Sequence, residues 1–454
     1  MSAGGTENYD VIVVGGGPAG TSASVHLAMR GARVALVERE KFPRAKLCGE
    51  FISPECLPHF ARLGVAEEMR AAGGACVGET IFFARSGRRV GVPSAWFGAE
   101  TDGDGRASSC ALGLSRAEMD QRLMLRARAV GVDVWEETQV AGLLFADEGR
   151  RVGGVRVERG GTESELRAPV TIDATGRARS LARRVEASLK GSVASRANTL
   201  DGANGANGAN ATNGADGAGG ANVVSGANMA HGASGARSGG AAKRMPLVAF
   251  KAHLENTSGG AGVCEIYFYR GGYGGLSRVE KNLSNLCFIV AARDVRARAS
   301  DAERVMREIV MSNARAAETL RGARVRTEWL AVALESFGRR ELVPCEGLLT
   351  VGDAASFIDP FTGSGMLMAL ESGELAGEAV ARALPALRRA GGGFAPLAED
   401  YRARYRARFA SRLRVCSWLR RAAFAPHLAT EACIAALGAS ERVRRALARA
   451  TRPA

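Results

Sequence analysis

The pattern of apolar and polar residues predicts a parallel sheet at the start of the chain. The short apolar run YDVIVV at 9–14 precedes a glycine-rich stretch, a helical segment at 20–30 and a second apolar run that ends at Glu38. Short β-branched runs without polar alternation are typical of strands buried on both faces. The order strand, helix, strand predicts a βαβ unit and hence an α/β fold.

The pattern changes farther along the chain. Residues 115–140 predict a helix that leads into a strand, followed by a hairpin at about 141–158 and a buried strand that ends at Gly176. Alternating segments between 244 and 335 predict antiparallel strands, and we expect the strand-like piece at 80–97 to join them. A strand at 347–351 then returns to the first sheet, and a long helix begins near Gly365.

Two segments do not belong to either sheet. Gly, Ala, Asn and Ser dominate residues 187–242, and such a composition buries too little apolar surface to offset the entropy of ordering. We expect a disordered insertion, either a tolerated surface expansion or a tether. The C-terminal part predicts a packed amphipathic helix, in preference to a membrane-contacting one. Its apolar residues at helical spacing are Tyr401, Tyr405, Phe409, Leu413, Cys416 and Leu419.

Composition narrows the functional classes. The 454 residues contain 61 Lys and Arg against 47 Asp and Glu, a net charge of +14. The arginines are scattered without interleaved aromatics, so we expect no nucleic-acid binding, while a weak peripheral contact with anionic lipid stays open. The nine cysteines form no Cys-x-x-Cys pair, which argues against a zinc site or disulfide framework. Without a leader or an 18-residue apolar run, we expect a cytoplasmic protein with no metal.

The glycine-rich stretch after the first strand has the chemistry of a dinucleotide site. Its sequence is Gly15-Gly16-Gly17-Pro18-Ala19-Gly20. In a G-x-G-x-x-G motif between strand and helix, the three glycines permit the tight turn, the approach of a pyrophosphate and the packing of helix on strand. The helix N-terminus supplies free N–H groups. We expect Glu38, with Arg39 next to it, to bind the adenosine ribose and to repel a 2′-phosphate, which leaves FAD or NAD.

A second constellation separates FAD from NAD. The strand at 347–351 delivers Gly352-Asp353, and Asp353 is placed to accept a hydrogen bond from a ribityl hydroxyl. The turn that follows contains Gly363, Gly365 and Met366 and would aim another helix N-terminus at the flavin, stabilising its reduced anion. NAD has no ribityl chain, so the pair of motifs predicts FAD.

Together the motifs resemble a known family. They are GGGPAG (15–20), FPRAKLCGEFISP (42–54), LSRAEMDQRL (114–123), IDATGRARS (172–180) and VGDAASFIDPFTGSGM (351–366). They are similar to the geranylgeranyl-reductase-like branch of FAD-dependent oxidoreductases, in the superfamily of hydroxybenzoate hydroxylases and flavin halogenases. The resemblance covers essentially the whole chain except 187–242.

The resemblance implies roles for four further residues. Arg116 would begin a helix near FAD, the backbone of Val140 would meet adenine, and Cys48 would lie beside the flavin as a packing residue or a reactive thiol. Tyr273 corresponds to a tyrosine in a turn over the substrate pocket, although Gly275 replaces the aromatic residue usual two positions later. His26, in the first helix, reads as a packed or half-exposed residue.

The predicted architecture is a Rossmann-type FAD-binding domain with an inserted antiparallel β substrate domain and a helical C-terminus. The expected FAD-binding domain is discontinuous, at 1–79, 110–186 and 336–395; the substrate domain is 80–109 and 243–335, the insertion 187–242 and the C-terminal helices 396–454. No second dinucleotide motif is present, so NAD(P)H or a reduced protein would donate electrons transiently.

The expected function is oxidoreduction of an apolar small molecule. The first chemistry is reduction of an isoprenoid-type carbon–carbon double bond. The alternatives are hydroxylation by a monooxygenase, and a non-redox cyclase or binding scaffold. A halogenase is disfavoured, because the Trp-x-Trp-x-Ile-Pro element of that branch is absent and the four tryptophans stand apart: Trp96, Trp135, Trp329 and Trp418.

Overall fold

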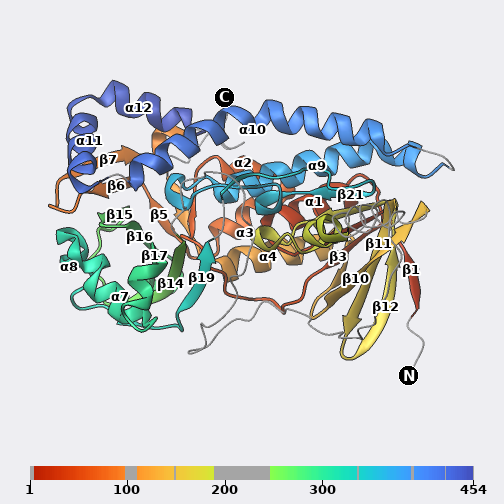
Figure 1. Ribbon diagram of the computed structural model, residues 1–454, viewed down its shortest axis with the longest axis horizontal. Coiled ribbons are helices and arrows are strands. Elements are labelled where there is room, and N and C mark those ends of the chain that lie inside the picture. Colours follow the sequence, from red (N-terminus) through yellow and green to blue (C-terminus); the bar gives the residue numbers. More distant parts are fainter. Residues whose placement is uncertain are drawn as a thin grey trace, which may run out of the picture.

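The computed structural model places two large sheets next to each other, with the C-terminal helices running along one side of both (Figure 1). It describes residues 5–97, 110–147, 150–188, 246–334, 337–389, 393–424 and 426–452. Nearly all of the expected insertion, 187–242, therefore lies outside the described residues. In the described part, no helix combines the length and apolar character needed to cross a lipid bilayer.

The predicted βαβ unit forms the centre of a five-stranded sheet in the order β21-β13-β2-β3-β9. Every pair in it is parallel, and β2 and β3 are buried at each position, as strands covered on both faces should be. The strands are β2 (Val11–Val14), β3 (Val34–Val37), β9 (Asp133–Trp135), β13 (Val170–Asp173) and β21 (Leu348–Thr350). The helices around this sheet are α1 (Pro18–Ala28), α2 (Cys56–Leu63), α3 (Ala66–Arg70), α4 (Arg116–Ala129) and α9 (Gly365–Leu387). The predicted Rossmann-type architecture is thus confirmed.

Smaller sheets flank the parallel one. A four-stranded sheet contains β1 (Thr6–Asn8), β12 (Thr162–Arg167), β11 (Arg151–Arg159) and β10 (Gln139–Ala146), and a two-stranded one contains β20 (Gly338–Arg339) and β22 (Ser356–Phe357). The hairpin predicted at 141–158 is confirmed as β10 and β11. The single strand predicted before it is wrong, because the chain turns at Glu137, with φ 53°, between β9 and β10.

One expectation about cysteine is also wrong, because the structure contains a disulfide between Cys76 and Cys110. The three-stranded sheet of β4 (Phe51–Ile52), β8 (Ala111–Gly113) and β5 (Ala75–Val77) explains the pairing. In it β5 lies antiparallel to β8, so Cys76 pairs with Leu112 and comes close to the residue that precedes β8. The two Cα atoms are 5.6 Å apart although 34 positions separate the residues.

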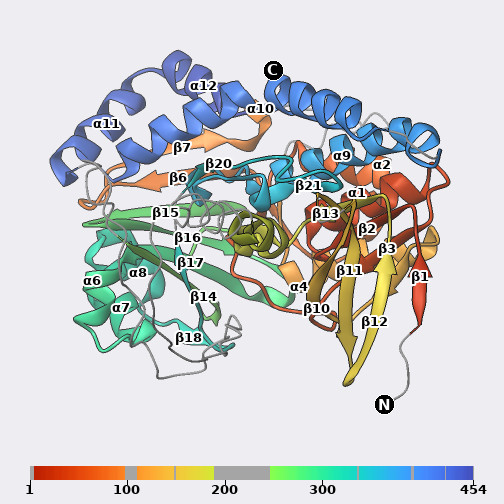
Figure 2. The ribbon, with the colours of Figure 1, turned by 45° about the vertical axis from the view of Figure 1, so that its right-hand side comes forward.

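The second large sheet has eight strands. They are β6 (Glu79–Phe83), β7 (Arg89–Pro93), β14 (Leu247–Glu255), β15 (Val263–Tyr269), β16 (Gly272–Arg278), β17 (Ser284–Ala291), β18 (Arg324–Val325) and β19 (Leu330–Leu334). The piece at 80–97 joins this sheet as predicted, but the pair β6 and β15 is parallel. One face carries α6 (Ala292–Arg296), α7 (Ala302–Glu308) and α8 (Ala314–Leu320), which the alternating pattern did not predict (Figure 2).

The C-terminal part contains α10 (Ala395–Ala423), α11 (His427–Ala439) and α12 (Glu441–Ala450). The predicted packed helix is confirmed, since Tyr401, Tyr405 and Phe409 of α10 are fully buried. Arg412, on the same helix, is buried too and donates to Glu371 of α9 at 2.7 Å. An ion pair in the interior, and not apolar packing alone, therefore fixes α10 to α9.

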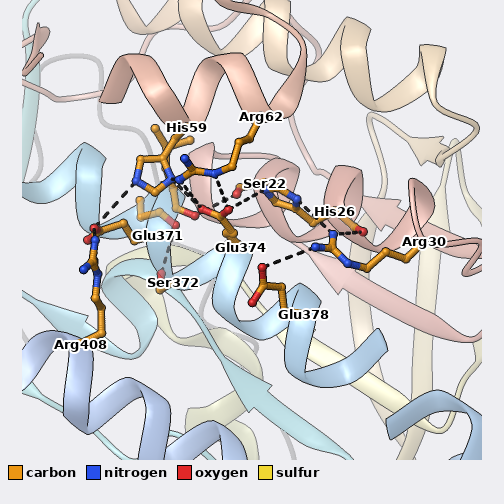
Figure 3. A network of polar contacts seen from close by, with 12 residues as sticks. Ser22, His26, Arg30, His59, Arg62, Glu371, Ser372, Glu374, Glu378 and Arg408 are labelled. Carbon is orange, nitrogen blue, oxygen red and sulfur yellow. Dashed lines mark hydrogen bonds and ion pairs between the residues drawn. The ribbon is translucent and has the colours of Figure 1, made fainter. Parts of the chain in front are cut away.

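A polar network continues this attachment across four helices (Figure 3). Glu374 of α9 accepts hydrogen bonds from His59 and Arg62 of α2, at 2.7 Å each. His26 of α1 lies beside it, its Nε2 3.8 Å from Glu374, and burial lowers the pKa of His26 to about 4. The structure thus makes His26 a buried, neutral packing residue, and the network fixes α1, α2, α9 and α10 as one block.

Candidate functional site

A continuous cavity of about 2480 Å³ joins the parallel sheet to the eight-stranded sheet. Pockets for ordinary small ligands measure roughly 300–1,000 Å³, so this one has room for a dinucleotide cofactor and a substrate. Most residues predicted from the sequence line it. They are Gly15, Gly17, Pro18, Ala19, Glu38, Arg39, Cys48, Arg116, Val140, Tyr273, Asp353, Gly363, Gly365 and Met366.

The first motif has the geometry its sequence predicts. Gly15 has a φ of +110°, and a Cβ there would lie 2.3 Å from the carbonyl oxygen of Ala174. Gly20 is not among the residues that line the cavity. A Cβ on Gly20 would lie 1.9 Å from the Gly15 oxygen, so a glycine is needed here for α1 to pack on β2. At Gly17 the nearest atom to such a Cβ, on Arg116, is 3.8 Å away. No side chain caps the α1 N-terminus, so its N–H groups are free to bind an anion.

The second motif presents a similar helix end. Gly363, with φ +64°, closes the short turn η7 (Pro360–Thr362), and α9 begins two residues later. No side chain caps α9, and the space where Gly365 would carry a Cβ is open. Met366 is buried at this end. Two helix N-termini without side-chain caps therefore line one cavity from positions some 350 residues apart in the chain.

Small residues bring these helix ends together. A Cβ on Gly373 of α9 would lie 2.2 Å from the Ala19 oxygen of α1, and one on Gly377 would lie 3.1 Å from the Cβ of His26. The Ser22 hydroxyl donates to the Leu370 oxygen at 2.9 Å across the same contact. The backbones of α1 and α9 are thus in direct contact, which sets the spacing of their N-termini.

Carboxylates and guanidinium groups alternate at the adenosine end. Glu38 accepts from the Gly16 N–H at 2.8 Å and lies 3.4 Å from Arg44, which in turn pairs with Asp120 at 2.9 Å. Arg116 binds Asp120 with both arms of its guanidinium group, at 2.9 and 2.7 Å. Burial alone would lower the pKa of Arg116, but the charge of Asp120 raises it. Arg116 is therefore a fixed cation on the cavity wall.

Several predicted residues occupy other parts of this wall. Arg39 pairs with Glu40 at 3.2 Å and is half exposed at the rim, while Val140 follows Gln139 at the start of β10. Asp353 lies in η6 (Gly352–Ala354), directly after the parallel sheet. Burial raises the pKa of Asp353, which the nearby Arg177 counteracts. A desolvated carboxyl group gains from a hydroxyl partner, which is what the ribityl hypothesis supplies.

These features together test whether FAD fits. The cavity offers two helix N-termini without side-chain caps, with Glu38 near the first and Asp353 near the second. The glycine cradle leaves open space at Gly17 and Gly365, where a Cβ would intrude on a ligand. The residues present fit FAD.

Sequence reasoning missed a buried charged cluster next to Cys48. Glu50 is fully buried with a φ of 53°, and its oxygens accept from Lys251, from His253 at 2.6 Å and from the Arg116 N–H at 2.8 Å. Burial alone would raise the pKa of Glu50, but His253 and Lys251 hold it below the usual 4.5. Left-handed backbone at a non-glycine residue often marks a functional site. The missed signal was Lys251 and His253, two polar residues on one face of β14, whose first four residues are all apolar.

Cys48 itself is held in place by this cluster. Its sulfur accepts from the Glu50 N–H at 3.4 Å, and the Asn285 amide donates to its carbonyl oxygen at 3.0 Å. Cys48 lines the cavity beside Gly49 and opposite Cys287 of β17. The structure thus places Cys48 at the junction of the two sheets, while its reactivity stays a prediction.

Tyr273 occupies a strand and not the expected turn. The turn ends at Gly271, and Tyr273 is the second residue of β16, because residues 272–278 pair with β15 and β17 on both sides. Its hydroxyl donates to buried Asp359, which Arg420 of α10 also contacts at 3.1 Å. Burial raises the pKa of Asp359. Tyr273, Asp359 and Arg420 thus link the eight-stranded sheet, the second motif and the C-terminal helices.

The wall around Tyr273 is apolar. The ring centroid of Phe361, in the second motif, lies 5.4–5.6 Å from the ring centroids of Phe82, Phe268 and Tyr273. The aromatic and aliphatic side chains that continue this surface are Val248, Phe250, Ile289, Trp329, Leu330, Val332, Leu419, Ile434 and Leu437. This end of the cavity suits an apolar molecule.

Comparison with known proteins identifies the family. Residues 8–385 match the family described as FAD binding domain. A flavin-dependent halogenase, armH3 of Armillaria mellea, is 32% identical over 171 residues, which are 37% of this chain and 32% of that protein. Digeranylgeranylglycerophospholipid reductase of Methanosarcina mazei is 29% identical over 171 residues, 37% of this chain and 38% of that protein. These matches span about a third of each relative's length.

Solved structures share the fold. A geranylgeranyl bacteriochlorophyll reductase-like protein from Thermoplasma acidophilum has a TM-score of 0.70 at 18% identity, covering 98% of this chain and 96% of its own. The myxobacterial chondrochloren halogenase CndH has a TM-score of 0.65 at 23% identity, covering 88% and 79%. The resemblance drawn from the sequence motifs is confirmed, while the reaction is not settled by these relatives. Because the family match extends over most of its length, this chain belongs to the FAD binding domain family.

Proposed function

We propose that this protein is an FAD-dependent oxidoreductase that reduces a carbon–carbon double bond in an apolar small molecule, as geranylgeranyl reductases do. One observation carries the proposal: a single cavity runs from two uncapped helix N-termini to an aromatic and aliphatic wall on the eight-stranded sheet. A cofactor held at the first end would face a substrate held at the second.

Each part of the wall has its own task in this proposal. Bound FAD supplies the hydride chemistry. The α1 N-terminus would bind the pyrophosphate, and the α9 N-terminus would lie at the edge of the flavin. Glu38 would bind the adenosine ribose and Asp353 the ribityl chain, while the apolar wall excludes water. Tyr273, whose hydroxyl is held by Asp359, is placed to deliver the proton that saturation of a double bond requires. NAD(P)H or a reduced protein brings the electrons.

The alternatives differ in the atoms that enter the product. A hydroxylase would add one oxygen atom, and a cyclase would leave the mass unchanged. A halogenase would add halogen, and halogenases are among the relatives. The four tryptophans, however, lie in separate segments of this structure: Trp96, Trp135, Trp329 and Trp418. A binding scaffold would give no product.

The decisive measurement is product mass. The purified protein is loaded with FAD, reduced with NADPH, NADH or dithionite, and incubated with isoprenoid alcohols and quinones, with and without oxygen and bromide. Gain of two hydrogen atoms without oxygen supports the proposal. Oxygen-dependent gain of one oxygen atom, or incorporation of bromine, replaces it with a competing reaction. Failure of the protein to bind FAD at all contradicts every version. Glu38→Ala, which should retain FAD less well, controls for adventitious flavin.

A further inference from the structure

The last 54 residues carry most of the net positive charge of the chain. Residues 401–454 contain 13 arginines and no lysine, against two acidic residues, Glu431 and Glu441, which leaves +11 of the total +14. Several of the arginines before 413 pair with acidic residues of the FAD-binding half, such as Glu371 and Glu341. The unbalanced charge is therefore concentrated toward the end of α10 and in α12.

The exposed surface of the helix between these two segments is apolar. The exposed residues of α11 are Leu428, Ala429, Ala432, Cys433, Ala436, Gly438 and Ala439, and Leu428 exposes 72% of its surface. The acidic residue of α11, Glu431, points to the β6–β7 turn, where it accepts from the N–H and the hydroxyl of Ser86 at 2.9 and 2.8 Å. Apolar surface is thus presented to the outside.

Arginines flank this apolar helix on both sides. On α10, Arg414, Trp418 and Arg421 have positions i, i+4 and i+7 and share one exposed face, where Trp418 is 73% exposed. On α12, exposed Arg442, Arg445 and Arg449 recur at i, i+3 and i+7. Both views place α11 and α12 together at one end of the molecule, next to β7 (Figures 1 and 2).

The same helices form one wall of the substrate end of the cavity. Thr430, Ile434 and Leu437 line it from α11, and Leu447 and Ala448 line it from α12. Cys433 and Ala436 of α11 and Trp418 of α10 are exposed and also line the cavity, so the proposed substrate site reaches the surface beside this apolar helix. This arrangement suits a substrate that arrives from an apolar phase.

We propose that the face formed by the end of α10, α11 and α12 docks on an anionic lipid bilayer. Arginines would lie at the headgroups, Trp418 at the interface, and α11 against the acyl region, which is the arrangement of interfacial amphipathic helices. An acidic partner protein would satisfy the arginines but leaves the apolar strip between them unexplained. Delivery of an apolar substrate from the membrane past α11 rests on the proposed function; docking itself does not.

The experiment is co-sedimentation of the FAD-loaded full chain with vesicles of phosphatidylcholine alone or mixed with phosphatidylglycerol. We expect binding to the mixed vesicles that decreases with salt, because surface charges are screened. The triple change Arg442→Glu, Arg445→Glu, Arg449→Glu should reduce it by about tenfold or more. Trp418→Ser should reduce binding at high salt, where the apolar contribution dominates. FAD content and melting temperature are measured for every variant.

The control places the same kind of substitution on another surface, and it matches in charge the double change Arg414→Glu with Arg421→Glu on α10. Arg156 and Arg159 are exposed on β11, at the opposite end of the molecule in Figure 2, and changing both to Glu should leave vesicle binding within twofold of the wild type. If the α12 variant does not fold, Arg414→Glu with Arg421→Glu tests the same face from α10.

Each result decides between distinct conclusions. Absence of binding to anionic vesicles, equal loss in the β11 control, or a dimer that buries α11 overturns docking. Turnover of detergent-dispersed substrate without vesicle binding overturns docking but keeps the proposed function. Vesicle binding without any turnover keeps docking and counts against the proposed function.

Discussion

The two ends of the cavity are built by different means. At the cofactor end the backbone decides the geometry: glycines set the turns, and helix N-termini without side-chain caps line the cavity. At the substrate end side chains decide it, since Glu50, Lys251, Tyr273 and Asp359 come from segments that meet only in the folded protein. A backbone site can be recognised from a local motif, whereas a side-chain site depends on how two sheets pack.

The two ends also use buried charge differently. Near Glu38 the charges alternate along one wall: Arg44 lies between Glu38 and Asp120, and Asp120 also binds Arg116. Near Glu50 one carboxylate carries the contacts of Lys251, His253 and the Arg116 backbone, and it connects the FAD-binding half to β14. Removing Glu50 would break all of these contacts at once, and it gives the largest effect we expect.

Glu50→Ala should destabilise the protein by about 3–5 kcal/mol, because it leaves the buried Lys251 ammonium without its partner. Thermal unfolding followed by circular dichroism measures this loss. Glu158→Ala, an exposed glutamate on β11, is the control and should stay within about 0.5 kcal/mol of the wild type. Equal effects of the two changes would contradict the importance of the junction.

The same group predicts a pH dependence. The pKa of folded Glu50 lies below its usual 4.5, so its ionised form stabilises the fold above that pH, and this contribution is lost as the pH falls through the folded pKa. The wild type should lose stability in acid more steeply than Glu50→Gln, which no longer titrates at this position. Parallel curves from pH 6 to pH 3 would show that Glu50 does not couple folding to protonation.

Two glycine substitutions test the backbone site. Gly20→Ala puts a Cβ 1.9 Å from the Gly15 oxygen, which should displace α1 from β2. We expect the free energy of unfolding to fall by about 1–3 kcal/mol, toward the upper end of this range. Gly17→Ala meets its nearest atom at 3.8 Å, so the apoprotein should keep its melting temperature while FAD affinity falls. FAD titration by fluorescence and apoprotein melting separate the two. If Gly17→Ala left the FAD affinity unchanged, the pyrophosphate would not bind at this turn.

The difference between the ends explains what the sequence could predict. Gly15, Gly17, Gly20 and Asp353 could be singled out from the sequence because each lies at the end of a buried strand or shortly after it, and such local motifs are visible along the chain. Glu50 and Asp359 lie inside motifs that carried the family resemblance, but their partners Lys251 and Arg420 are far away in the sequence. Spacing along the chain holds no information about such contacts.

The errors have the same origin. The Cys76–Cys110 bond depends on the antiparallel pairing of two short strands, β5 and β8, and Tyr273 entered a strand because β15 and β17 supply partners on both sides. Helices α6–α8 cover one face of the eight-stranded sheet, and a pattern of alternating residues does not show what covers a face. Contacts between separate elements decided each case.

The smallest predicted effect sharpens the contrast at the substrate end. Tyr273→Phe removes the hydroxyl that donates to Asp359 and should cost about 1 kcal/mol, with FAD affinity unchanged and turnover reduced. Burial raises the pKa of Asp359, and the Tyr273 hydrogen bond counteracts this. Without it the pKa should rise further, so the destabilisation should grow as the pH rises and Asp359 ionises. Tyr269→Phe, which loses a hydrogen bond to the Ile289 carbonyl oxygen on the same sheet, should show a loss that does not vary with pH. Identical pH profiles for the two variants would show that Asp359 does not respond to Tyr273, and the link from the second motif to the substrate wall would then be steric alone.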